Sequence, residues 1–117
     1  MGQYSLGQAG EIVASRLLAA LGFTILRRNF TCHLGEIDII AERGGVRYFI
    51  EVKTRSGVSF GDPGEAVNAD KQRRLRRLAS YYIVASRYPG PVDFGVVEVI
   101  HSSADRRYRA WLVDHAF

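Results

Sequence analysis

Two apolar segments joined by Gly44-Gly45 constrain the fold of this 117-residue chain more than any other feature. Residues 36–42 and 46–54 are rich in isoleucine, valine and aromatic side chains, which favour β-strands. A Gly-Gly pair between two such segments is typical of a two-residue hairpin turn. The sequence therefore predicts a hairpin in which Arg43 pairs with Val46 and pairing continues residue by residue away from the turn.

The charged residues of this hairpin gather on one of its faces, because side chains alternate along a strand. The other face is entirely apolar and must be packed; it holds Ile37, Ile39, Ala41, Tyr48, Ile50 and Val52. The predicted pairing places Asp38 opposite Glu51 and Glu36 opposite Lys53. These four residues lie at the end of the hairpin far from the turn.

Two directly opposed carboxylates destabilise a sheet. At about 5 Å and an effective dielectric constant of about 20, the repulsion between Asp38 and Glu51 is about 3 kcal/mol. Lys53 could act as a counter-ion, one acid could be protonated, or a divalent cation could bind. Grouped carboxylate oxygens suit Mg²⁺ or Mn²⁺. A solvated sheet face with incidental charges is the remaining interpretation, and the hairpin alone leaves all four open.

The rest of the chain alternates between helix and strand patterns. Periodicity predicts helices at 5–21 and 65–87 and strands at 23–33, 92–100 and 106–114. Residues 55–64 contain three glycines and a proline, which predicts a loop. The order α, β, β, β, α, β, β predicts an α/β fold with a mixed β-sheet flanked by helices. The length suits a single domain over residues 1–117.

Both helices place polar residues where they could meet the charged hairpin. Glu11 lies on the apolar stripe of the first helix, which points it towards the core; a helix-start acid favoured by the macrodipole is the alternative. Lys71 and Gln72 lie on the inward side of the second helix, where a capping role after Asp70 is the alternative.

A basic segment covers the start of the second helix. Residues 71–77 contain five basic residues in seven, and no acid follows as far as Arg87. Arg73, Arg76 and Arg77 face away from the apolar stripe of this helix. The formal net charge of +4 agrees with an anionic partner. This pattern is typical of a surface that binds a phosphate backbone, and a solvated helix face is the alternative.

Other features limit where the protein works. Cys32 is the single cysteine, so an internal disulfide is excluded. No run of 18 apolar residues appears, so we expect no membrane span. The N-terminal residues lack the basic and apolar parts of a signal peptide. We therefore expect a cytoplasmic protein without a membrane partner.

Asp38 in one strand, followed by Glu51-Val52-Lys53 in the next, resembles the core of PD-(D/E)XK nucleases. The segments GEIVASRLLAALGFTILRRNF, GEIDIIAERGG, FIEVKTRSGVSFGDPGEAV and KQRRLRRLASYYI together resemble the YraN family of predicted bacterial endonucleases. This resemblance covers residues 7–83. The arrangement is also similar to archaeal Holliday junction resolvases, which place an acid in the first helix. One departure is Ile37, which stands where the PD motif has proline.

The resemblance implies a restriction-endonuclease-like core and a role for each residue of the motif. Asp38 and Glu51 would bind Mg²⁺ or Mn²⁺, and the Val52 carbonyl could add a neutral ligand. Lys53 would activate water or stabilise developing charge. Glu11 would be the auxiliary acid of the first helix.

Further residues would support this chemistry or hold the nucleic acid. Glu36 and Gln72 would be supporting polar residues. The nucleic-acid-binding set would be Arg55, Lys71, Arg73, Arg74, Arg76 and Arg77. We therefore expect a metal-dependent endonuclease that hydrolyses phosphodiester bonds in DNA, branched or damaged DNA included. A nucleic-acid-binding module with little or no cleavage is the first alternative, and a protein whose acids merely pair with Lys53 is the second. Two symmetric cuts would require a homodimer.

Overall fold

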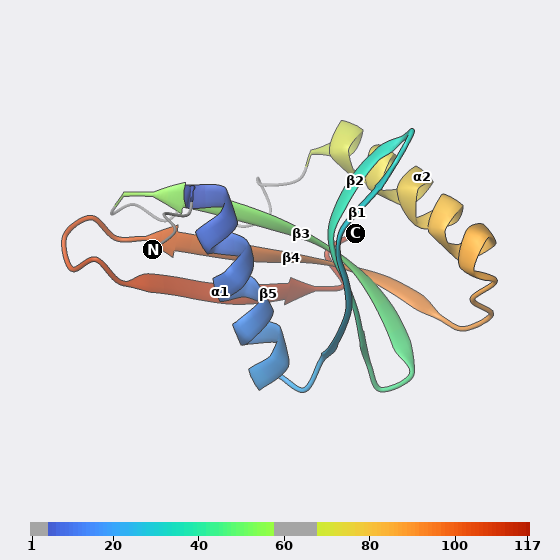
Figure 1. Ribbon diagram of the computed structural model, residues 1–117, viewed down its shortest axis with the longest axis horizontal. Coiled ribbons are helices and arrows are strands. Elements are labelled where there is room, and N and C mark those ends of the chain that lie inside the picture. The colour runs from blue at the N-terminus through green and yellow to red at the C-terminus, as the bar shows by residue number, and fades with distance from the viewer. Residues whose placement is uncertain (1–4, 58–67) are drawn as a thin grey trace.

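Two helices pack against a five-stranded sheet in the computed structural model, which describes residues 5–57 and 68–117 (Figure 1). The elements in chain order are α1 (Leu6–Ala20), β1 (Thr24–Cys32), β2 (Gly35–Arg43), β3 (Val46–Ser56), α2 (Ala69–Ser86), β4 (Val92–His101) and β5 (Tyr108–Asp114). The strands lie in the order β1-β2-β3-β4-β5; β3 and β4 are parallel and the other neighbours antiparallel. The predicted α/β fold, its mixed sheet and its element order are confirmed.

Both helices begin at capping residues. Ser5 Oγ accepts a hydrogen bond from the Gln8 N–H (3.1 Å), and the Ser5 N–H donates to Gln8 Oε1 (3.0 Å), which forms a capping box for α1. Asn68 caps α2 by accepting from the Lys71 N–H at 3.0 Å. Asp70, in the first turn of α2, forms an ion pair with Arg73. The predicted helix start at residues 65–67 lies outside the described residues.

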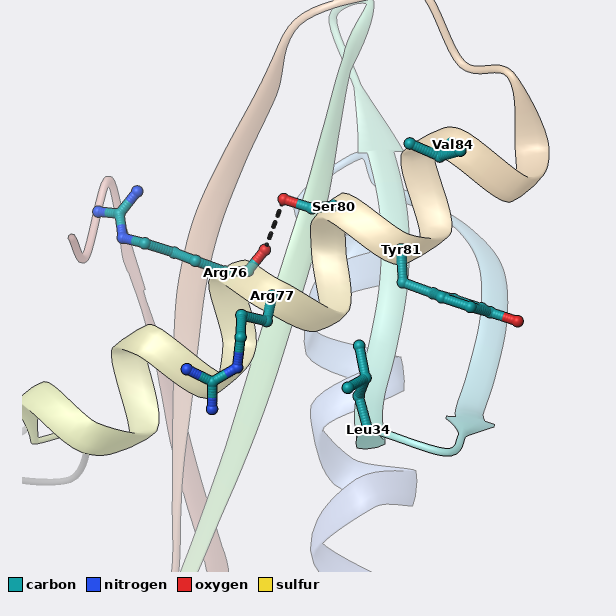
Figure 2. A pocket seen from close by; sticks show the side chains of 6 residues that line it. All are labelled: Leu34, Arg76, Arg77, Ser80, Tyr81 and Val84. Atoms are coloured by element: carbon teal, nitrogen blue, oxygen red, sulfur yellow. Dashed lines mark hydrogen bonds between the residues drawn. The ribbon is translucent and has the colours of Figure 1, made fainter.

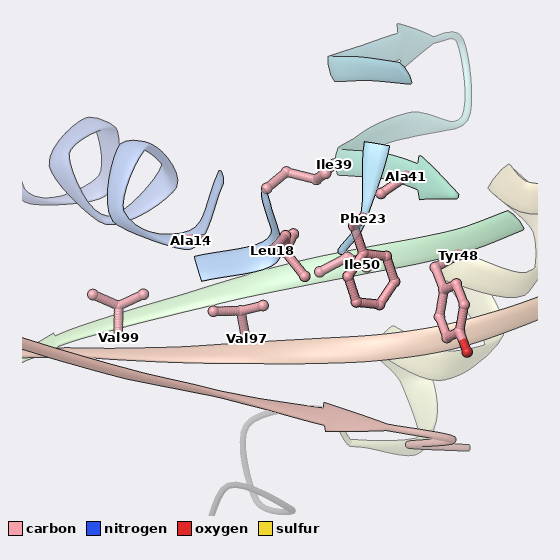
Figure 3. Packing of buried hydrophobic residues seen from close by; sticks show 9 residues of the cluster. All are labelled: Ala14, Leu18, Phe23, Ile39, Ala41, Tyr48, Ile50, Val97 and Val99. Atoms are coloured by element: carbon pink, nitrogen blue, oxygen red, sulfur yellow. The ribbon is translucent and has the colours of Figure 1, made fainter. Parts of the chain in front are cut away.

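One hydrophobic core lies between α1 and the sheet, as Figure 3 shows. Its buried members are Ala14, Leu18, Phe23, Ile39, Ala41, Tyr48, Ile50, Val97 and Val99. Gly10 lets α1 approach β3 closely, because a Cβ atom there would lie 1.9 Å from Thr54 Oγ1. This close contact holds the first turns of α1 against β3.

A second core lies between α2 and the other face of the sheet. Its buried members are Phe30, Ile37, Ile40, Phe49, Leu75, Leu78, Ala79 and Phe94. The prediction that Ile37 shares a face with Ile39 and Ile50 is therefore wrong. Asn29 has a left-handed backbone (φ 54°), and the β1–β2 pairing omits Asn29 and Asp38. Ile37 and Ile39 thus pack on opposite faces of the sheet, on either side of this unpaired position of β2.

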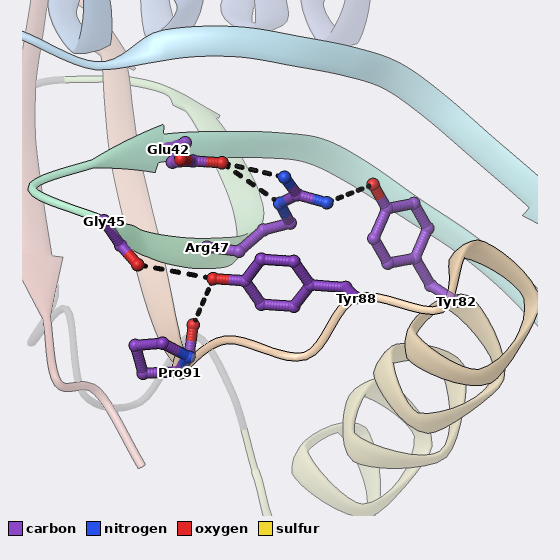
Figure 4. A network of polar contacts seen from close by, with 6 residues as sticks. All are labelled: Glu42, Gly45, Arg47, Tyr82, Tyr88 and Pro91. Carbon is purple, nitrogen blue, oxygen red and sulfur yellow. Dashed lines mark hydrogen bonds and ion pairs between the residues drawn. The ribbon is translucent and has the colours of Figure 1, made fainter.

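The C-terminal end of α2 is tied to the β2–β3 hairpin by a polar network centred on Arg47 (Figure 4). The Arg47 guanidinium donates to Glu42 Oε2 (2.8 Å) and to the Tyr82 hydroxyl (3.3 Å), and it lies 4.0 Å from the centre of the Tyr88 ring. The Tyr88 hydroxyl donates to the Pro91 carbonyl at 2.8 Å. These contacts fix the direction in which α2 runs across the sheet.

Two predicted boundaries shift in ways that matter for the site. β3 extends to Ser56, so Arg55 lies in a strand and not in the predicted loop. The last strand begins at Tyr108, two residues later than predicted.

Among the described residues, we find no helix that combines the length and the apolar character needed to span a membrane.

Candidate active site

The predicted pairing of the hairpin is correct near its turn and ends abruptly. The β2–β3 ladder runs from Arg43 and Val46 to Ile39 and Ile50, in the predicted register. Beyond these residues β2 remains paired with β1, whereas β3 remains paired with β4 as far as Ser56. The strands β2 and β3 therefore diverge (Figure 1). The expected oppositions of Asp38 with Glu51 and of Glu36 with Lys53 are therefore not part of the ladder.

Asp38 lies where the two strands separate. Its Oδ2 atom accepts a hydrogen bond of 2.8 Å from the backbone N–H of Val52 on β3. The carboxylate thus takes the place that a ladder carbonyl would occupy, and it points towards β3. The structure uses the Val52 N–H to orient Asp38, while metal binding by the Val52 carbonyl stays a prediction.

A cleft of about 270 Å³ opens at this point of divergence. It is lined by Leu6, Gly7, Glu11, Asp38, Glu51, Val52, Lys53, Thr54 and Lys71. Because β2 and β3 are not paired here, both α1 and α2 contribute residues to the cleft, although the two helices pack on opposite faces of the sheet. The structure thus brings together five ionisable residues that the sequence singled out in three separate segments.

Negative charge accumulates in the cleft. Burial, followed by the charge of Glu51, raises the pKa of Asp38 from 3.8 to about 7, against the lowering effect of the Val52 N–H. Glu11 and Glu36 add smaller contributions in the same direction. The pKa of Glu11 is itself raised, first by burial and then by Glu36, while Arg28 opposes the shift. In the protein alone, Asp38 is therefore partly protonated near neutral pH.

Asn29 joins the acids of α1 and β2, and the sequence reading missed it. With its amide nitrogen turned towards the carboxylates, it donates to Glu11 Oε1 (2.7 Å) and to Glu36 Oε1 (2.9 Å). Glu36 therefore interacts with Asn29. Among the described residues, we find no ion pair between Glu36 and Lys53. An asparagine inside an otherwise strand-like segment was the available signal, because asparagine is depleted in strands.

Glu98 is a second missed residue, on β4 beside Lys53. It is fully buried (0% exposed) and forms a 3.1 Å ion pair with Arg55 Nε. Burial raises the pKa of Glu98, and the charges of Arg55 and Lys53 oppose that rise. Arg55, predicted to bind nucleic acid, thus has a partner inside the protein. The signal was an acid within the apolar strand sequence VVEVI.

The basic residues of α2 divide into groups with different surroundings. Lys71 is half-buried and lines the cleft, whereas Gln72 beside it is half-buried and does not. Arg76 lies over the rings of Phe94 (5.1 Å) and Phe117 (5.4 Å), so its guanidinium packs against the protein. The exposed members of the predicted binding set are Arg73, Arg74, Arg76 and Arg77.

The donor set of the cleft fits a hydrated divalent cation. Asp38 and Glu51 offer hard carboxylate oxygens, and a cation would neutralise the charge that raises the pKa of Asp38. In residues 5–57 and 68–117, no three carboxylate, histidine or cysteine side chains converge enough to hold a metal ion. Mg²⁺ commonly binds through one or two carboxylates and keeps several waters, so two protein ligands suffice.

A larger open hollow lies outside this region, against α2 and the tip of the β1–β2 hairpin (Figure 2). Leu34, Tyr81 and Val84 give it an apolar lining, and Val84 is 78% exposed. Ser80 Oγ donates to the Arg76 carbonyl at 3.0 Å and is thereby occupied. No carboxylate is among the described residues that line this hollow, so the charged cleft has no counterpart there.

Comparison with known proteins identifies the family. The profile described as "Uncharacterised protein family UPF0102" matches residues 10–101. A UPF0102 protein of Symbiobacterium thermophilum is 50% identical, over 96% of this chain and 95% of its own length. UPF0102 proteins of Caldicellulosiruptor saccharolyticus (41%, over 100% of both chains) and Chlorobaculum parvum (43%, over 94% and 87%) are also similar. The resemblance to YraN proteins is confirmed at this level, and the chain belongs to the UPF0102 family.

Proposed function

We propose that this protein is a metal-dependent endonuclease that hydrolyses phosphodiester bonds in DNA. The observation that carries the proposal is the convergence of Asp38, Glu51 and Lys53 in one cleft, with Glu11 on one side and Lys71 on the other. Two carboxylates beside an amine supply the ligand and general acid–base groups that phosphodiester hydrolysis requires. The resemblance to the PD-(D/E)XK core supports the same assignment.

Asp38 and Glu51 would hold Mg²⁺ or Mn²⁺, with the Val52 carbonyl as a further ligand. When bound, the cation supplies Lewis-acid activation of water and neutralises charge on the phosphate. The 2.8 Å hydrogen bond from the Val52 N–H holds the Asp38 carboxylate in place before any cation binds. Such preorganisation reduces the ordering needed on binding.

Lys53 on β3 and Glu11 on α1 line the same cleft as the two ligands. The Lys53 amine lines the cleft beside Glu51, where it can hold the attacking water or a phosphate oxygen. Glu11 reaches the cleft from α1, and its raised pKa suits an auxiliary acid that exchanges a proton with solvent. Neither role requires the two side chains to contact each other.

The basic start of α2 would hold the DNA backbone. Lys71 lies in the cleft, and the exposed arginines at residues 73, 74 and 77 continue the positive surface along the helix. Backbone contacts give affinity without sequence selectivity. We therefore propose structure-selective or nonselective binding, with branched or damaged DNA as the substrate. Two coordinated cuts would require a homodimer.

A nuclease assay tests the proposal directly. The full chain is incubated with branched, single-stranded and duplex DNA in Mg²⁺ or Mn²⁺, alongside Asp38→Asn, Glu51→Gln and the control Asp105→Asn. Asp105 is an exposed carboxylate that pairs with Arg109 outside the cleft. We expect cleavage by the wild type and by the control, and at least a hundredfold loss in the two cleft variants.

Other outcomes would support the alternatives. Salt-sensitive DNA binding without cleavage would indicate a nucleic-acid-binding module. Calorimetry without divalent-ion binding at millimolar metal would indicate that the acids have only a structural role. Cleavage that persists in both Asp38→Asn and Glu51→Gln would refute the assigned site.

A further inference from the structure

Asn29 connects two carboxylates that come from separate elements, and the proposed hydrolysis assigns it no role. Its amide nitrogen donates to Glu11 Oε1 on α1 (2.7 Å) and to Glu36 Oε1 on β2 (2.9 Å). We propose that Asn29 is a positioning residue, which holds the Glu11 carboxylate beside Asp38 and thereby sets the cation affinity of the cleft. This inference rests on the proposed metal-dependent function.

Asn29 lies between two like charges. Glu11 and Glu36 each place an oxygen within hydrogen-bond distance of one nitrogen, so these like charges lie close together. A shared donor between two carboxylates offsets their repulsion, and hydrogen bonds to ionised groups are about twice as strong as neutral ones. Without the donor, Glu11 would turn away from Glu36, and its carboxylate would leave the cleft.

The backbone at residue 29 restricts the residue type. Asn29 has φ 54°, a left-handed conformation that asparagine, aspartate and glycine accept most readily. Of these three residues, only asparagine has a side chain that can donate hydrogen bonds. Asparagine thus combines tolerance of the left-handed backbone with the donor that bridges the two acids.

Asn29 reaches the cleft through Glu11. Glu11 lines both the charged cleft and a smaller adjoining hollow, which Gln8, Ile12, Arg28 and Asn29 also line. Asn29 therefore contacts Glu11 from outside the cleft, and does not line the cleft itself. This geometry is that of an outer residue that orients a group near a metal, and loss of such residues typically weakens metal affinity about 10- to 100-fold.

The principal experiment compares Mg²⁺ and Mn²⁺ affinities by calorimetry on the full chain. Asn29→Gly permits the left-handed backbone and removes the side-chain donor together with the rest of the amide. Arg87→Gly is the matched control, because Arg87 is left-handed (φ 55°) at the C-terminal cap of α2 and does not line the cleft. We expect at least tenfold weaker metal binding for Asn29→Gly and less than a twofold change for Arg87→Gly.

A double-mutant cycle separates positioning from a general structural effect. If Asn29 acts through Glu11, then Asn29→Gly should weaken metal binding less than twofold in a Glu11→Gln background. An equal loss in both backgrounds would overturn the proposal, as would wild-type affinity in Asn29→Gly itself.

A metal-free measurement keeps this test independent of the proposed function. The side-chain amide resonances of Asn29 in the NMR spectrum should shift in Glu11→Gln and also in Glu36→Gln, because each variant removes one charged acceptor. If the Asn29 resonances shift while the wild type binds no metal, the proposed metal-dependent function fails, although the contact of Asn29 with the two acids is supported. The role of Asn29 in cation affinity is then refuted as well. Unchanged resonances in both variants would overturn the inference whatever the metal data show.

Discussion

Asp38→Asn should stabilise the metal-free protein at alkaline pH, although most substitutions of half-buried residues destabilise. Burial and the charge of Glu51 make the ionised Asp38 carboxylate unfavourable in the folded state. An asparagine removes this charge, and its side-chain oxygen can still accept the hydrogen bond from the Val52 N–H. The variant therefore isolates the electrostatic cost from the geometry.

The sign and size follow from linkage. The pKa of Asp38 is about 7 in the folded protein against 3.8 for the ordinary side chain, so between these values the folded state binds more protons than the unfolded state. Wild-type stability from this group is therefore fully present below pH 3.8 and is lost as the pH rises to about 7. The complete shift corresponds to an upper limit of about 4 kcal/mol, of which about 2–3 kcal/mol is lost between pH 5 and pH 8.

Urea unfolding in a chelating buffer at pH 5 and at pH 8 measures this effect. We expect the stability advantage of Asp38→Asn over the wild type to grow by up to about 2–3 kcal/mol between the two values. Asp105→Asn is the control, because Arg109 and the Arg107 N–H lower the pKa of Asp105 to about 2. Asp105 is therefore ionised at both pH values, and the stability difference of this variant should change little between pH 5 and pH 8. An advantage for Asp38→Asn that does not change with pH would refute the placement of Asp38 among like charges.

Three further predictions concern the frame of the cleft and its basic surface. Gly10→Ala should destabilise the protein by about 1–3 kcal/mol in urea unfolding, because its Cβ atom would lie 1.9 Å from Thr54 Oγ1. Arg55→Leu should cost about 3–5 kcal/mol by the same measurement, because it leaves the buried Glu98 unpaired. Arg77→Gln should weaken DNA binding about equally for all sequences and reduce the slope of affinity against salt by about one in fluorescence anisotropy titrations.

Each of these predictions has a matched control. Thr54→Ala should recover part of the stability lost in Gly10→Ala, because it removes the clashing hydroxyl. The double variant Arg55→Leu, Glu98→Leu should be more stable than Arg55→Leu alone, since no unpaired charge remains. Arg16→Gln, an exposed arginine on α1, should leave DNA affinity unchanged apart from a small nonspecific effect. Equal losses in a variant and its control would contradict the corresponding mechanism.

The local parts of the fold could be predicted from the sequence. The Gly44-Gly45 turn sets the hairpin register by itself, and the ladder from Arg43 and Val46 to Ile39 and Ile50 follows it. The charged residues after that point were also identified, because their types conflict with a buried sheet. What failed was the assumption that strand alternation continues through them, as the position of Ile37 demonstrates.

The missed residues depend on contacts between segments distant in the chain. Asn29 matters only because α1 and β2 both bring a carboxylate to this left-handed residue of β1. Glu98 is buried because the parallel pairing of β3 with β4 places it beside Lys53 and Arg55. The periodicity of one strand therefore does not indicate either contact, although asparagine and glutamate are unusual residue types for their strands.

Several unfavourable features occur together around the charged cleft, and this clustering indicates that they have a common origin. Next to the point where β2 leaves β3, Asn29 adopts a left-handed backbone, Asp38 is partly protonated near neutral pH, and Glu98 is buried at 0% exposure. Each feature costs stability by itself, and sequences tolerate such conflicts chiefly at functional sites. A sheet that merely tolerated scattered charges would not also bring both helices to the same opening. The divergence of two strands thus gives carboxylates from three elements access to one cleft, which a fully paired sheet would have closed.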